Sequence, residues 1–135
     1  MILALRLFFL VVLGSMLSVT GWAGFEVPLW DVPRAVGGHP WFIATLCDAY
    51  WGFFTFFAWQ CFKEPTWLAR VLWFVALVLL GNIAMASYGL AVVWRLPLHA
   101  RAEQVLLRGR PVSCWLPVLL IAGIGLVTAL AWIRR

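Results

Sequence analysis

The residue of this chain with the clearest potential for chemistry is Asp48, an acidic side chain inside an otherwise apolar run of the sequence. A charge in such a run is costly if the run lies in lipid, so its carboxyl group is expected to be buried and either paired or neutral. Small and polar residues recur with it at helical spacing, at Thr45, Asp48, Gly52, Thr55 and Trp59. This spacing predicts a polar stripe along one helix.

Two interpretations of Asp48 are compatible with this stripe. In the first, Asp48 is a structural link to Asn82, which is expected at a similar depth in the next apolar run; such a bond contributes about 0.6–2 kcal/mol. In the second, the carboxyl group handles a proton or a cation. The candidate residues of this polar or ligand site are Asp48, Asn82, Thr45, Thr55, Tyr50 and Tyr88.

The residue sets of common catalytic and metal sites are absent from the sequence. His39 and His99 are expected in different loops, and the three cysteines form no CxxC pair. No Ser–His–Asp set and no phosphate-binding glycine loop occurs. We therefore expect no metal and no enzymatic activity. The ring-rich run 42–59 could accommodate a lipid, a quinone or a pigment.

Four apolar runs must position these residues, at about 2–22, 41–62, 67–94 and 112–133. Hydrophobic residues make up 65% of the chain and charged residues 11%, a balance foreign to soluble domains. Each run can cross about 30 Å of hydrocarbon at about 1.5 Å per residue. The sequence predicts one all-α membrane domain, residues 1–135, with four transmembrane helices.

The connections between the runs carry their own signals. Pro65 ends the second run and Thr66 can cap the third, so these two runs are expected to form an antiparallel hairpin. The run 67–94 exceeds the bilayer thickness and must tilt, kink or protrude, with Gly81 and Gly89 as points of flexibility. A short interfacial helix is expected before the fourth run.

Small residues at helical spacing predict faces on which helices pack closely, because small side chains let backbones approach in lipid. The predicted packing faces consist of Gly14, Ser18 and Gly21 in the first run and Gly125 and Ala129 in the last. The ten tryptophans cluster near the ends of the runs, a distribution typical of an aromatic belt at the membrane surface.

The net charge of +5 comes from basic residues that flank the runs. The residues expected to contact lipid headgroups are Arg101, Arg108, Arg110, Arg134 and Arg135. With four spans, five basic residues fall on each side, so their distribution does not decide the orientation. Arg6 near the start of the first run, with Glu26 and Asp31 after the run, favours both termini in the cytoplasm of a bacterial inner membrane. No soluble basic face exists for nucleic acid.

Two strings within the second and third runs carry a resemblance. They are DAYWGFFTFFAW at 48–59 and GNIAMASY at 81–88, together with PLWD at 28–31. With them the chain resembles a domain-of-unknown-function family of small bacterial and plant membrane proteins, over about residues 20–96. The resemblance implies no activity and no catalytic residue. It implies that Asp48 and Asn82 belong to a recurrent unit, with 97–135 as an extension.

Sparse polar chemistry favours a small accessory or assembly subunit of a larger membrane complex in an energy-converting membrane, respiratory or photosynthetic. Its expected partners are membrane lipids and other integral membrane subunits. The alternative is an autonomous binder or transporter of a lipophilic or protonatable small molecule, such as a quinone, a pigment or a lipid, centred on Asp48.

Overall fold

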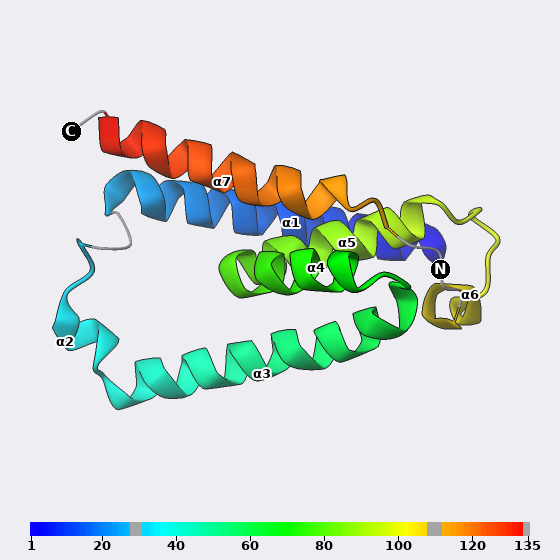
Figure 1. Cartoon of the computed structure of the whole chain (residues 1–135), viewed down its shortest axis with the longest axis horizontal. Helices are drawn as coiled ribbons and strands as arrows, with labels where there is room; N and C mark the ends of the chain where they lie inside the picture. Colours follow the sequence, from blue (N-terminus) through cyan, green and yellow to red (C-terminus); the bar gives the residue numbers. More distant parts are fainter. Residues whose placement is uncertain (28–30, 108–111, 134–135) are drawn as a thin grey trace.

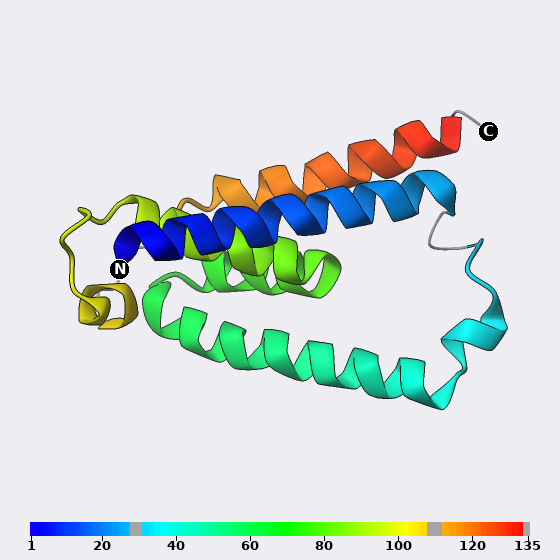
Figure 2. The same cartoon turned by 180° about the vertical axis from the view of Figure 1, so that it is seen from behind.

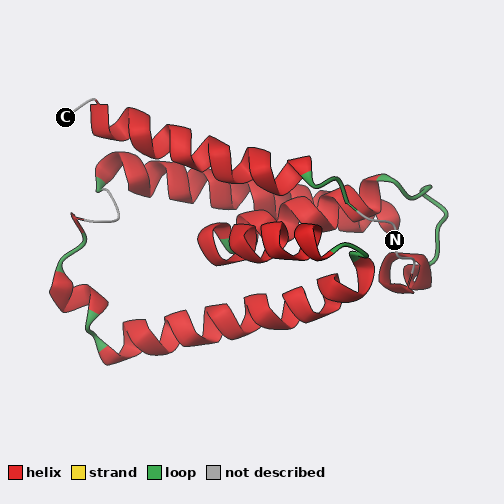
Figure 3. Ribbon diagram, viewed as in Figure 1, coloured by secondary structure: helices red, strands yellow, loops and turns green. Residues whose placement is uncertain are grey.

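The computed structural model describes residues 1–27, 31–107 and 112–133, and within these ranges it contains helices and no strand (Figure 3). The all-α prediction is thereby confirmed. The helices are α1 Ile2–Glu26, α2 Arg34–Gly37, α3 Pro40–Lys63, α4 Trp67–Leu80, α5 Asn82–Trp94, α6 Ala102–Leu107 and α7 Trp115–Ile133. The short helix expected before the last apolar run is present as α6.

Three long helices, α1, α3 and α7, run along the long axis of the molecule (Figures 1 and 2). The α6 end holds Met1, the turn from α3 to α4, α6 and the start of α7, and the α2 end holds the other ends of these three helices. Met1 and Ile133 therefore lie at opposite ends. The expected arrangement had both termini on one side.

The difference arises at Gly81, where the predicted helix 67–94 is broken. Gly81 has φ 50° and ψ −120°, a conformation that side-chain-bearing residues rarely adopt. In the last hydrogen bond of α4, the Gly81 N–H donates to the Leu77 carbonyl (2.9 Å). In the first hydrogen bond of α5, the Met85 N–H donates to the Gly81 carbonyl (3.1 Å). α5 then runs back toward the α6 end (Figures 1 and 2).

This reversal corrects the prediction of four spanning helices. A segment that starts at the α6 end and returns to it does not reach the other end of the bundle. The sequence predicted only that the run 67–94 would tilt, kink or protrude, with Gly81 as one point of flexibility. Within the described residues, α1 and α3 are long and apolar enough to span a membrane. The other apolar helices, Trp67–Leu80, Asn82–Trp94 and Trp115–Leu130, are shorter.

The core lies where the α4–α5 hairpin packs between α1 and α7. Its buried residues include Trp73, Leu77, Ile83, Ala84 and Tyr88. α1 approaches α5 closely at Gly89, where an added Cβ would lie 2.4 Å from the Phe9 ring. The second half of α3 packs against this core through Phe56, Phe57 and Trp59. In contrast, residues 40–48 of α3 are all exposed, and an 18-residue stretch of the helix contains no buried residue.

Candidate functional site

Asp48, the predicted centre of the site, is exposed on α3. The structure gives its carboxyl group no hydrogen bond or ion pair within the described residues. Asn82 is also exposed, at the start of α5, and the Thr45 and Thr55 hydroxyls donate to carbonyl groups of their own helix. The expectation of a buried Asp48 paired with these residues is wrong for this chain, because α3 diverges from the hairpin beside it.

The two candidate tyrosines lie elsewhere in the packing. The Tyr50 hydroxyl donates to the carbonyl of Val78 near the tip of the hairpin (3.1 Å). One turn further along α3, the Phe53 ring covers Gly81, where an added Cβ would lie 2.6 Å from its Cζ atom. α3 thus holds the tip of the α4–α5 hairpin, while Tyr88 is fully buried in the core.

Among the described residues, no neighbour packs closely against the glycines of the predicted packing faces. A Cβ added at Gly14, Gly21 or Gly125 would have nothing within 4 Å. Ala129 and Ser18 are exposed, and the Ser18 hydroxyl donates to the Gly14 carbonyl (2.8 Å). Of the predicted headgroup contacts, Arg101 is exposed at the α6 end. The others, Arg108, Arg110, Arg134 and Arg135, lie outside the described residues.

The polar site that the structure does assemble is centred on Glu64, which the sequence did not single out. α3 ends at Lys63 because Glu64 is extended (ψ 114°) and Pro65 follows it. Thr66 then caps α4, accepting a hydrogen bond from the Ala69 N–H (3.4 Å), as expected. This turn directs the Glu64 side chain into the protein, where the residue is 0% exposed.

One carboxylate oxygen of Glu64 joins three parts of the fold. Its Oε1 atom accepts hydrogen bonds from the Tyr88 hydroxyl (3.0 Å) and from the Val112 N–H (2.9 Å), which precedes α7. The Glu64 backbone carbonyl accepts a third hydrogen bond, from the Arg70 guanidinium on α4 (2.8 Å). Charge-assisted bonds of this kind are roughly twice as strong as neutral ones.

Aromatic rings enclose the Glu64–Tyr88 pair. The Tyr88 ring makes edge contacts with Phe56, Trp59 and Trp73, at centroid distances of 5.9, 6.0 and 5.0 Å. The Lys63 ammonium lies over the Trp59 ring, 5.0 Å from its centroid, and donates to the Val105 carbonyl of α6. These rings exclude solvent and strengthen the polar contacts inside them.

Several buried polar atoms around this pair have no hydrogen-bond partner in the structure. They are Oε2 of Glu64, both side-chain polar atoms of Gln60, and the indole nitrogens of Trp59 and Trp73. The set contains hydrogen-bond donors and acceptors, and buried groups of both kinds are commonly satisfied by ordered water. No group of three or more His, Cys, Asp or Glu side chains among the described residues could hold a metal.

A second polar contact at the same end involves Arg6. Its guanidinium donates to the carbonyls of Val93 (3.3 Å), Trp94 (3.2 Å) and Leu96 (2.6 Å) and lies 5.3 Å from the Trp94 ring centroid. The Val93 and Trp94 carbonyls belong to the last turn of α5, where the helix dipole favours a cation, and the Leu96 carbonyl follows the helix. Arg6 therefore fixes the start of α1 to the end of α5.

The comparisons with known proteins bear on the resemblance. A family model with the description "Protein of unknown function (DUF1475)" matches residues 4–111. The match includes α1 to α6 and the Glu64 turn, and it leaves α7 outside. No curated protein and no solved structure matched. The resemblance to a family of unknown function is confirmed, over residues 4–111 and not only about 20–96, and the chain belongs to the DUF1475 family.

Proposed function

We propose that this protein is a subunit of a larger complex of the bacterial inner membrane and that it joins that complex through α3. The observation that carries the proposal is the exposed Asp48 carboxyl group, which no other described residue pairs. It lies on a helix whose length and apolar character suit a membrane span. A charged side chain at the centre of such a helix costs about 2.5–3.5 kcal/mol if lipid surrounds it.

Other exposed side chains of α3 are also of the kind that a neighbouring protein would cover. Trp41 is 78% exposed and Trp51 70% exposed, and both lie in the stretch of α3 without buried residues. Tryptophan is enriched where protein surfaces meet, because it contributes a large rigid contact area. A neighbouring helix would bury these rings and offer Asp48 a hydrogen-bond donor.

The partner is a transmembrane helix of a different protein that presents a basic or hydrogen-bonding side chain opposite Asp48. A second copy of this chain is a poor partner, because a two-fold interface through α3 would bring two Asp48 carboxyl groups together. The described basic residues lie toward the ends of the bundle, so a copy has no cation to offer at that depth.

The alternative function, binding of a quinone, pigment or lipid around Asp48, has less support. A binding site for such a molecule encloses most of its surface. Asp48 lies instead on an open helix face, and the enclosed polar atoms of the chain surround Glu64. An energy-converting complex remains the setting that we propose for the subunit.

Crosslinking inside the membrane tests this proposal. A photo-crosslinking amino acid at Trp51 should capture one integral membrane protein, whereas the same probe at Leu126 on α7 should not. Asp48→Leu should abolish this crosslink, and Asp48→Asn should retain it because the amide can still form hydrogen bonds. Thr128→Leu on α7 is the matched control, since it also replaces an exposed polar side chain.

The mapped crosslink distinguishes the possible occupants. A partner with a basic or polar side chain opposite Asp48 supports the proposal. A crosslink between two copies of this chain, or crosslinks to lipid alone, would contradict it. A captured small molecule that is lost in Asp48→Asn would favour the binder instead.

A further inference from the structure

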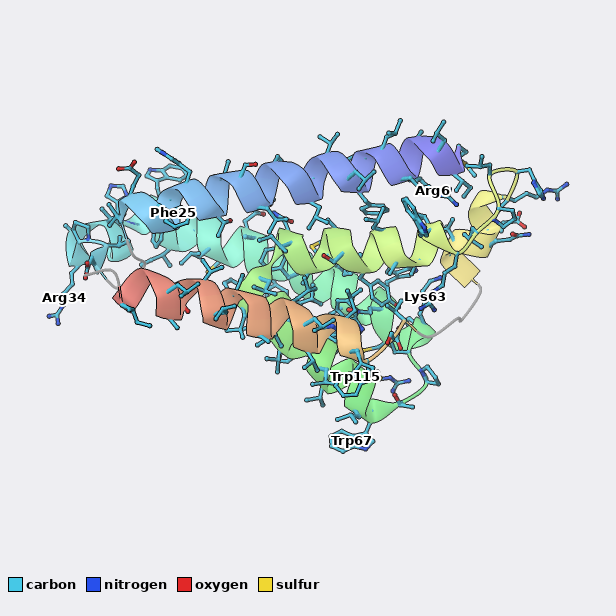
Figure 4. The ribbon with its side chains drawn as sticks, turned by 90° about the horizontal axis from the view of Figure 1, so that it is seen from above. Arg6, Phe25, Arg34, Lys63, Trp67 and Trp115 are labelled. Carbon is cyan, nitrogen blue, oxygen red and sulfur yellow. The ribbon has the colours of Figure 1, made fainter. Side chains whose placement is uncertain are left out.

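The two ends of the bundle differ in charge. At the α6 end, Arg70, Arg95 and Arg101 are exposed and only Glu103 opposes them among the described exposed residues. Arg6 and Lys63 add two more basic residues at this end and the buried Glu64 adds one acidic residue, although all three are engaged in the contacts described above (Figure 4).

The α2 end has the opposite balance. Its exposed charged residues in the described ranges are Glu26, Asp31 and Arg34, so the acidic side chains outnumber the basic one. Figure 4 shows Phe25 and Arg34 together at this end, far from Arg6 and Lys63.

The reversal at Gly81 produces this asymmetry. If residues 67–94 formed one spanning helix, Arg95 and Arg101 would lie on the same side as Arg34, and Lys63 on the other. Because α5 returns to the α6 end, Arg95 and Arg101 join Lys63 instead. Among the described residues, the even distribution of basic side chains expected from the sequence thus becomes an excess at the α6 end.

We propose that the α6 end of the bundle lies against the anionic cytoplasmic leaflet and that the α2 end faces the opposite side of the membrane. Basic residues in short loops near helix ends are retained on the cytoplasmic side. They are also attracted to the negative lipids of that leaflet. This orientation rests on the membrane location in the proposed function, but not on any partner subunit.

Cysteine labelling in intact cells tests the orientation. In full-length protein with Cys47, Cys61 and Cys114 replaced by serine, single cysteines are placed at Val36 and at His99, both of which are exposed. A membrane-impermeant maleimide should label the cysteine at position 36 from outside the cell. Position 99 should react only after the cells are opened.

Each result decides the proposal. Labelling of both positions from the same side would overturn the hairpin topology, and labelling of position 99 from outside and 36 from inside would overturn the orientation. Labelling of both positions in a soluble fraction would show that the chain does not cross a membrane. Failure to find a partner for α3 would leave the labelling pattern unchanged.

The role of charge is tested separately. Replacing Arg95 and Arg101 with glutamine should produce a mixed population in which position 36 is labelled partly from each side. Arg34→Gln is the matched control and should leave the orientation as it was. An unchanged orientation in the double variant would contradict the assignment of this surface to the anionic leaflet.

Discussion

Replacement of Gly81 by alanine distinguishes a reversed hairpin from a continuous helix by the sign of its effect on stability. In the hairpin, alanine would have to adopt φ 50°, which costs about 1–3 kcal/mol. Its Cβ would also lie 2.6 Å from the Phe53 ring, and such overpacking costs about 1–3 kcal/mol. The sum is a loss of about 2–6 kcal/mol. In a continuous helix the same change would instead stabilise the protein by about 0.8–1 kcal/mol.

Unfolding by SDS in mixed micelles, followed by circular dichroism, measures this difference. Gly14→Ala is the control for helix propensity, because an added Cβ there meets nothing within 4 Å. Gly89→Ala is the control for packing, because its Cβ would approach the Phe9 ring but its backbone is helical. In a Phe53→Ala background the packing cost disappears, so Gly81→Ala should cost only the backbone part, about 1–3 kcal/mol. A Gly81→Ala protein as stable as the parent would refute the hairpin.

Three further predictions concern the α6 end and use the same unfolding measurement. Glu64→Ala should destabilise the fold by about 2–4 kcal/mol, because it leaves the Tyr88 hydroxyl and the Val112 N–H buried without an acceptor. If the losses of stability in Glu64→Ala and Tyr88→Phe add up in the double variant, the two side chains are not coupled and the prediction is contradicted. Arg6→Ala should reduce the free energy of unfolding by about 1–3 kcal/mol, and Arg6→Lys should reduce it less, since lysine keeps the charge at the end of α5. Equal losses of stability in the two variants would argue against a role for this charge at the helix end. Gln60→Met should destabilise the protein, because we expect a water molecule to bridge the Gln60 carboxamide and Glu64. If no water lies between the two side chains, methionine should instead stabilise the protein by removing an unpaired buried polar group.

The long helices could be predicted from the sequence because each depends on a local signal. The runs 2–22, 41–62 and 112–133 correspond to Ile2–Glu26, Pro40–Lys63 and Trp115–Ile133. Their apolar length is sufficient to define a helix, whatever lies beside it. The turn at Pro65 was predictable for the same reason, since proline and a capping residue act on their own neighbours.

The reversal at Gly81 depends on contacts between distant residues. A glycine in an apolar run is compatible with a straight helix, a kink or a reversal. The reversal is stabilised by the Phe53 ring over Gly81 and by the Tyr50 hydroxyl on the Val78 carbonyl. These contacts come from α3, and no local pattern in 67–94 encodes them.

The candidate site shows the same limit. The sequence predicted a site at Asp48 because the neighbours of Asp48 in the sequence are apolar. Glu64 lies between Lys63 and Pro65, in a segment that the sequence identifies only as a turn. The burial of Glu64 is decided by residues 24 and 48 positions away, the separations of its hydrogen bonds to Tyr88 and Val112. Gln60, one turn earlier and equally buried, was the nearest local sign of a polar site.

The bond between Arg6 and the end of α5 has a consequence for biosynthesis. The two partners are separated by 87 to 90 residues, so the first turn of α1 is made long before its acceptors exist. At about 5–20 residues per second, that turn must wait roughly 4–18 s for α5 to leave the ribosome. During this interval Ile2 also lacks Leu96 and Ala100, the residues that later bury it. The earliest part of the chain is therefore among the last to reach its final contacts, and a nascent chain that stops before Val93 lacks the carbonyl groups that hold Arg6 and the residues that bury Ile2.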